Sequence, residues 1–78
     1  MSAPRGVILD LAAELVTETL SAHQLALAEP VDARFRKAAS GTTGVEISVR
    51  LRDRTFAEVA RALLQDRFGG SPDVFVVR

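Results

Sequence analysis

Apolar and polar residues alternate along two neighbouring stretches in the middle of the chain. From Val45 to Leu51 every second residue is apolar, which is the period of a strand with one buried face. Residues 31–37 show the same alternation less regularly, and the Ser-Gly-Thr-Thr-Gly run at 40–44 is typical of a turn. The pattern therefore predicts an antiparallel hairpin built from residues 31–38 and 45–52.

Helical spacing is found on either side of this hairpin. Residues 6–28 are rich in Leu, Ala and Glu, and they predict one long helix that ends before Pro30. Farther along, Thr55-Phe56-Ala57-Glu58 matches the S/T-x-x-E capping box, and apolar residues follow at helical spacing as far as Phe68. The Gly69-Gly70-Ser71-Pro72 run predicts a left-handed glycine at the end of this second helix.

Val74-Phe75-Val76-Val77 predicts a third strand. Four consecutive apolar residues favour burial on both faces, or a central place in a sheet. A helix-containing connection of about 20 residues normally joins parallel strands. The prediction is a single α+β domain over residues 1–78, in the order helix–strand–strand–helix–strand, with a frayed start at residues 1–5. The small sheet is mixed and three-stranded, with both helices packed on one face.

The first helix has more apolar surface than one packed face requires. Its apolar arc covers about 200°, against about 100° for a helix that covers a core. One side is expected to cover the sheet: Ile8, Leu11, Leu15 and Ala22. The other side is expected to face the second helix or another subunit: Leu9, Val16, Leu20 and Leu27. The sequence thus predicts a homodimer through these four residues, with complete coverage by the second helix as the alternative.

Charge is unevenly distributed, although the whole chain is formally neutral. Residues 1–32 have a net charge of −4 and residues 33–54 a net charge of +4. The alternation of the hairpin predicts a basic sheet face: Arg34, Arg36, Arg50 and Arg52, with Arg54 nearby. Such a face can be ordinary solvent-exposed strand decoration, a site for an acidic protein partner, or a KH-like surface for nucleic acid.

Catalytic and cofactor motifs are missing from the sequence. There is no cysteine, His23 is the only histidine, and the glycine-rich runs match neither a P-loop nor a dinucleotide fingerprint. We therefore expect a non-enzymatic protein with no metal, no cofactor and no small-molecule substrate. Without a signal peptide or a membrane-spanning run, the expected location is the cytoplasm.

Residues 44–78 resemble the C-terminal part of the alkaline-shock envelope-stress family. The likeness lies in Gly-Val-Glu-Ile-Ser-Val-Arg-Leu-Arg, then Phe-Ala-Glu-Val-Ala-Arg-Ala-Leu-Leu, then Gly-Gly-Ser-Pro-Asp-Val-Phe-Val-Val. This resemblance implies a small bacterial protein without enzymatic activity, associated with the cell envelope and its stress response through partner proteins.

Taken together, these features predict a protein–protein interaction or assembly module that forms a homodimer, with another protein as a further candidate partner. The alternative is a KH-like domain that binds nucleic acid through the arginine-rich sheet face.

Overall fold

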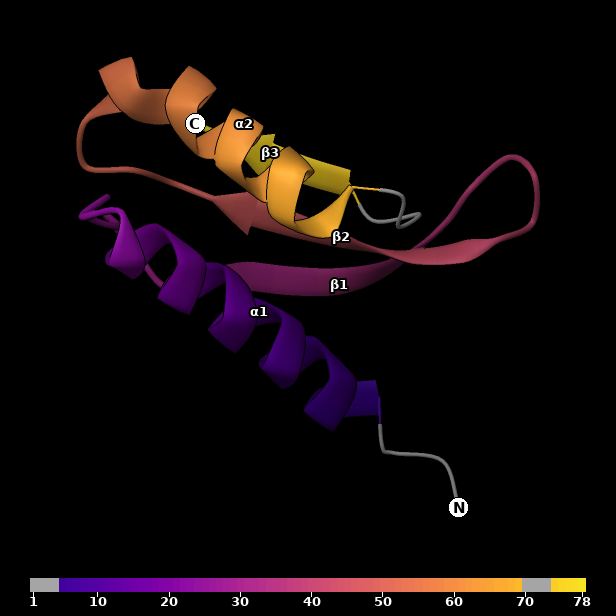
Figure 1. The fold of residues 1–78 in the computed structure, drawn as a ribbon. Helices are drawn as coiled ribbons and strands as arrows, with labels where there is room; N and C mark the ends of the chain where they lie inside the picture. The colour runs from indigo at the N-terminus through magenta and orange to yellow at the C-terminus, as the bar shows by residue number, and fades with distance from the viewer. Residues whose placement is uncertain (1–4, 70–73) are drawn as a thin grey trace.

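Two helices pack on the same side of a three-stranded sheet, which confirms the α+β architecture and the predicted order of elements (Figure 1). The structure is a computed structural model, and it describes residues 5–69 and 74–78. The expected frayed start lies almost entirely outside these residues. The elements are α1 (Arg5–Ala22), β1 (Asp32–Lys37), β2 (Thr43–Val49), the 3-10 helix η1 (Arg54–Phe56), α2 (Ala57–Phe68) and β3 (Val74–Val77).

The sheet has the order β1-β2-β3, with β2 in the centre. β1 and β2 are antiparallel, and Arg34 lies opposite Glu46 in their register. β2 and β3 are parallel, and Val49 lies opposite Val77. This mixed arrangement follows from the connections, because a short turn reverses the chain whereas a crossover through α2 preserves its direction.

Contrary to one of the two expectations for the last strand, β3 lies at an edge of the sheet. Phe75 and Val77 are buried beneath α2, while Val74 and Val76 are half-buried on the other face. The helix therefore provides the burial that a central position would have provided, and the second face of β3 stays partly open.

The core lies between the sheet and the two helices. α1 packs mainly against β1, and α2 packs mainly against β3 (Figure 1). The buried hydrophobic side chains are Val16, Leu20, Leu25, Val45, Ile47, Val49, Leu51, Ala60, Leu64, Phe75 and Val77. Val45, Ile47 and Val49 of β2 are among them, so the period of two in the sequence identified the inward face of the central strand correctly.

α1 ends at Ala22, six residues before the predicted end of the helix. Gln24 adopts a left-handed backbone with φ of 59°, and its N–H donates to the Ser21 carbonyl at 2.9 Å. The Leu25 N–H donates to the Leu20 carbonyl at 3.0 Å, which completes a Schellman motif. A glutamine occupies the position where glycine is usual, so the composition gave no sign of this stop.

Beyond α1 the chain runs extended beside the segment that follows β2. The Ala28 N–H donates to the Arg50 carbonyl, the Arg52 N–H donates to the Ala26 carbonyl, and Leu27 forms an isolated antiparallel bridge with Leu51. Leu27 therefore belongs to an extended segment, not to the helix on which the sequence pattern placed it.

The N-terminal cap of the second helical segment is Asp53, not Thr55. Both the N–H and the hydroxyl of Thr55 donate to Oδ1 of Asp53, at 3.0 and 2.6 Å. One turn of 3-10 helix precedes α2, and this shifts the cap two residues towards the N-terminus. At the other end Gly69 has an extended backbone, with φ of −60°, so the left-handed turn that the Gly69-Gly70 pair permits is not formed at Gly69. Gly70 and Pro72 lie outside the described residues.

Asp53→Ala should lower the urea midpoint of unfolding at neutral pH and leave it nearly unchanged in strong acid. The two bonds from Thr55 hold the pKa of Asp53 below its ordinary value, so the carboxylate stabilises the fold above that value. The contribution is lost as the pH falls through the lowered pKa. Urea titrations of both proteins across acidic pH test this, and a difference that persists when Asp53 is protonated would contradict it.

Candidate functional site

The apolar surface of α1 is divided between core and solvent in a way that reverses the prediction. Val16 and Leu20 are buried in the core of the same chain, and Leu9 and Leu27 are partly buried against it. All four had been predicted to form the self-association surface, and that assignment is wrong for the buried pair, because neither side chain is accessible to another molecule.

The side of α1 that was expected to cover the sheet is the exposed one. We call it the apolar flank, and it consists of Val7, Ile8, Leu11 and Leu15, which are between 40% and 53% exposed. Ala22 is exposed as well. The two sides of this helix are almost equally hydrophobic, so the pattern showed that there was an excess of apolar surface but not which side would be left over.

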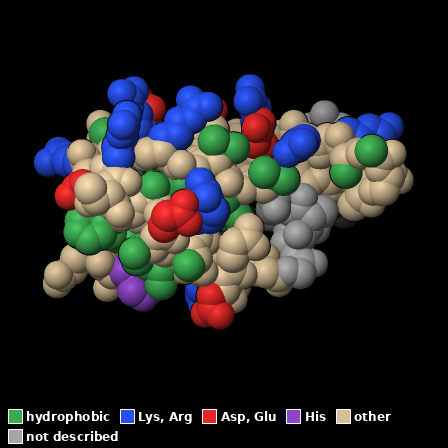
Figure 2. Space-filling model, turned by 90° about the horizontal axis from the view of Figure 1, so that it is seen from above, with side chains coloured by type: hydrophobic (Ala, Val, Ile, Leu, Met, Phe, Trp, Pro, Cys, Tyr) green, Lys and Arg blue, Asp and Glu red, His purple; other side chains and the backbone are tan. Residues whose placement is uncertain are grey.

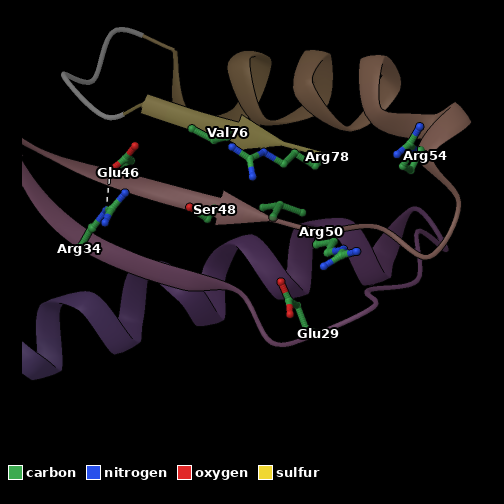
Figure 3. A pocket seen from close by; sticks show the side chains of 9 residues that line it. Glu29, Arg34, Glu46, Ser48, Arg50, Arg54, Val76 and Arg78 are labelled. Atoms are coloured by element: carbon green, nitrogen blue, oxygen red, sulfur yellow. Dashed lines mark hydrogen bonds and ion pairs between the residues drawn. The ribbon is translucent and has the colours of Figure 1, made fainter.

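The arginine-rich face is the sheet face that carries no helix, which we call the outer face. Figure 2 shows Lys and Arg side chains gathered along the border of the molecule that lies behind the sheet in Figure 1. A hollow of about 460 Å³, the basic hollow, opens on this face (Figure 3). Its lining residues are Glu29, Arg34, Glu46, Ser48, Val49, Arg50, Arg54, Val76 and Arg78.

Three of the five predicted basic residues line this hollow, namely Arg34, Arg50 and Arg54. Arg36 lies elsewhere, beside the hairpin turn, where it lines a different recess with Lys37. Arg52 is also separate, because the chain bends at this residue and its side chain lines a small apolar recess. Strand alternation thus did not predict which arginines share the hollow, because Arg36 lies within β1 but near the hairpin turn, whereas Arg50 and Arg54 lie beyond the end of β2.

Arg78 joins the basic hollow, although the sequence pattern did not identify it. The parallel register pairs Val49 with Val77, so the next residues, Arg50 and Arg78, lie side by side just beyond the ends of β2 and β3. Figure 3 shows both side chains on the same face of the sheet. The sequence contained two signals: a basic residue directly follows each of two strands, and the connection between these strands is of the parallel kind. Only the register of the pairing brings the two basic residues together.

Arg34 and Glu46 form a cross-strand ion pair, with 2.6 Å between Nε and Oε2. The hydrogen bond raises the pKa of Arg34 and lowers the pKa of Glu46, so both remain charged at neutral pH. The positive charge of Arg34 is therefore already balanced by the carboxylate of Glu46. Within the described residues, no ion pair involves Arg50, Arg54 or Arg78.

The acidic residues of α1 do not neutralise the hollow. Asp10, Glu14 and Glu18 are exposed on a helix that packs against the opposite face of the sheet. In the part of the chain that the structure describes, no ion pair joins them to the basic hollow. The carboxylates of α1 and the arginines of the hollow therefore lie on opposite sides of the sheet.

Other chemistry is limited within residues 5–69 and 74–78. His23 is exposed, and its Nδ1 lies 3.0 Å from the Thr19 carbonyl near the end of α1. The described side chains include no group of three or more His, Asp or Glu that could bind a metal ion. No helix among the described residues has both the length and the hydrophobicity needed to cross a membrane.

Comparisons with protein-family models, with curated proteins and with solved structures found no match for this chain. The likeness to the alkaline-shock family therefore stays a prediction from the sequence. The functional proposal rests on the chemistry of the apolar flank and the basic hollow.

Proposed function

We propose that this protein is a non-enzymatic protein–protein interaction module that self-associates through the apolar flank of α1. The observation that carries this proposal is the exposure of the flank, whose four large aliphatic side chains lie on one side of one helix. Contiguous apolar patches on a soluble protein usually mark interaction surfaces, because burying them releases ordered water.

The spacing of the flank supports a second copy as the partner. Ile8, Leu11 and Leu15 are separated by three and then four residues, the a/d spacing with which helices pair. A stripe of this kind can pack against the same stripe of another copy about a twofold axis, so that one surface serves both partners. The opposite face of α1 packs into the core, so the flank is the apolar surface of this helix that remains for a partner.

The sequence also leaves a KH-like nucleic-acid binder as the alternative, acting through the outer face. The residues that line the basic hollow include no aromatic side chain on which a base could stack. The lack of a stacking platform favours protein interaction over nucleic-acid binding. The cytoplasmic location predicted from the sequence is kept as part of the proposal.

Leu11→Glu should dissociate the homodimer while leaving the fold intact. Leu11 is 53% exposed in one copy, so a charge is tolerated there in the monomer but would be buried in the dimer. We expect the dissociation constant to rise about 30-fold or more, as for a central interface residue. Light scattering coupled to size exclusion at several concentrations measures the mass, which is 8.4 kDa for one copy.

The matched control is Val59→Glu, at an equally exposed apolar residue of α2. This variant should retain the mass of a dimer, and circular dichroism should show that both variants remain folded. A wild-type protein that stays monomeric at every concentration, or a Leu11→Glu variant that stays dimeric, would overturn the proposed interface.

A further inference from the structure

The basic hollow on the outer face is independent of the apolar flank, because the two surfaces lie on opposite sides of the sheet. It therefore stays open when α1 is covered by a second copy. Figure 3 shows its side chains contributed by β1, β2 and β3, by the segment before β1 and by η1. Residues far apart in the sequence are thus brought together around a hollow of about 460 Å³, within the size range of ordinary ligand sites.

Arg50 and Arg78 are held next to each other by backbone hydrogen bonds. The Arg78 N–H donates to the Val49 carbonyl at 2.9 Å, and the Leu51 N–H donates to the Arg78 carbonyl at 2.8 Å. Their backbones cannot separate without breaking this ladder. Like charges on neighbouring strands of a sheet repel each other. An anion placed between two guanidinium groups is attracted to both and offsets that repulsion.

The other charges define the limits of the hollow. Arg34 is already paired with Glu46, so the cations left for a ligand are Arg50, Arg54 and Arg78. Figure 3 shows Arg54 on η1, apart from Arg78, with Glu29 on the side of Arg50 away from β3. The cations are therefore spread along the hollow, and they match separate acidic groups better than one compact anion.

We propose that the basic hollow binds an acidic peptide segment of a partner protein. One carboxylate of the segment lies between Arg50 and Arg78, and a second reaches Arg54. The Ser48 hydroxyl can donate to a backbone carbonyl of the segment, and Val76 gives its aliphatic carbons an apolar contact. Guanidinium groups hold carboxylates with two parallel hydrogen bonds, and the separated cations of the hollow fit carboxylates that are spaced along a peptide.

Fluorescence anisotropy with a labelled oligoglutamate peptide tests this proposal on the whole protein at low and at physiological salt. The double variant Arg50→Gln/Arg78→Gln should bind the peptide about tenfold more weakly than the wild type. The matched control is Arg36→Gln/Lys37→Gln, which removes the same two charges outside the basic hollow and should bind within about twofold of the wild type. Circular dichroism confirms that each variant is folded.

Three results would overturn the proposal: no binding of the peptide at low salt, an equal loss in the Arg36→Gln/Lys37→Gln control, or tighter binding of a single-stranded oligonucleotide of matched charge. The last result would assign the hollow to nucleic acid instead. The Leu11→Glu variant should bind the peptide as the wild type does. Failure of self-association and failure of the acidic-peptide site are therefore distinguished by separate measurements.

Discussion

Leu20→Ala is expected to lower the free energy of unfolding by about 2–5 kcal/mol, because it removes a completely buried leucine side chain from the core. Leu20 also supplies the carbonyl that closes the Schellman motif, and it belongs to the same buried cluster as Leu25 and Leu64. A cavity at this position weakens the contact of α1 with the rest of the fold. Urea unfolding followed by circular dichroism measures the loss.

Leu11→Ala is the matched control for this prediction, since it makes the same chemical change in the same helix at a residue that is 53% exposed. At concentrations where the protein is monomeric, its unfolding free energy should stay within about 0.5 kcal/mol of the wild type. Equal losses at the two positions would mean that the exposed and buried sides of α1 are assigned wrongly, and the proposed self-association through this helix would then fail.

Phe75→Ala is expected to cost about 3–5 kcal/mol, which is the usual range for removing a buried aromatic ring. Phe75 is 8% exposed, and the centre of its ring lies 5.8 Å from that of Phe68. The ring joins β3 to the last turn of α2, so its loss weakens the contact that covers the edge strand. The urea midpoint should therefore fall sharply at neutral pH.

Phe56→Ala removes the same ring from an exposed position at the end of η1, where 46% of the residue is accessible. Its effect should be within about 1 kcal/mol, because nearly half of the residue is already accessible to water. If this control proves as destabilising as Phe75→Ala, then β3 does not lie beneath α2 as described. The Arg50–Arg78 pair would then also need revision, since it depends on the register of β3.

The two proposed surfaces follow from a single feature of the architecture, which is that both helices lie on one face of the sheet. The helix layer leaves one flank of α1 exposed, and four large aliphatic side chains lie there, on the same helix as the exposed Asp10, Glu14 and Glu18. The helix-free face carries the arginines that alternate with the core residues of the strands. The proposed self-association and the proposed recognition of an acidic partner would therefore use separate surfaces of one small domain.

Local sequence patterns were sufficient for the elements and for most of the core. The period of two along β2 predicted that Val45, Ile47 and Val49 would share a buried face, and they do. Strand alternation works because the backbone geometry alone sends successive side chains to opposite faces. The ends of α1 were harder to predict, because Gln24 adopts a conformation that glycine usually signals.

The sequence by itself thus determined the order of elements, the inward face of the central strand and the presence of surplus apolar surface on the first helix. Only the tertiary structure decided that Val16 and Leu20 are buried while Leu11 and Leu15 are exposed, since both sides of α1 are aliphatic and the docking of α2 and β1 selects between them. Likewise, Arg78 meets Arg50 only through the parallel register, because strand pairing brings together residues that no local pattern relates.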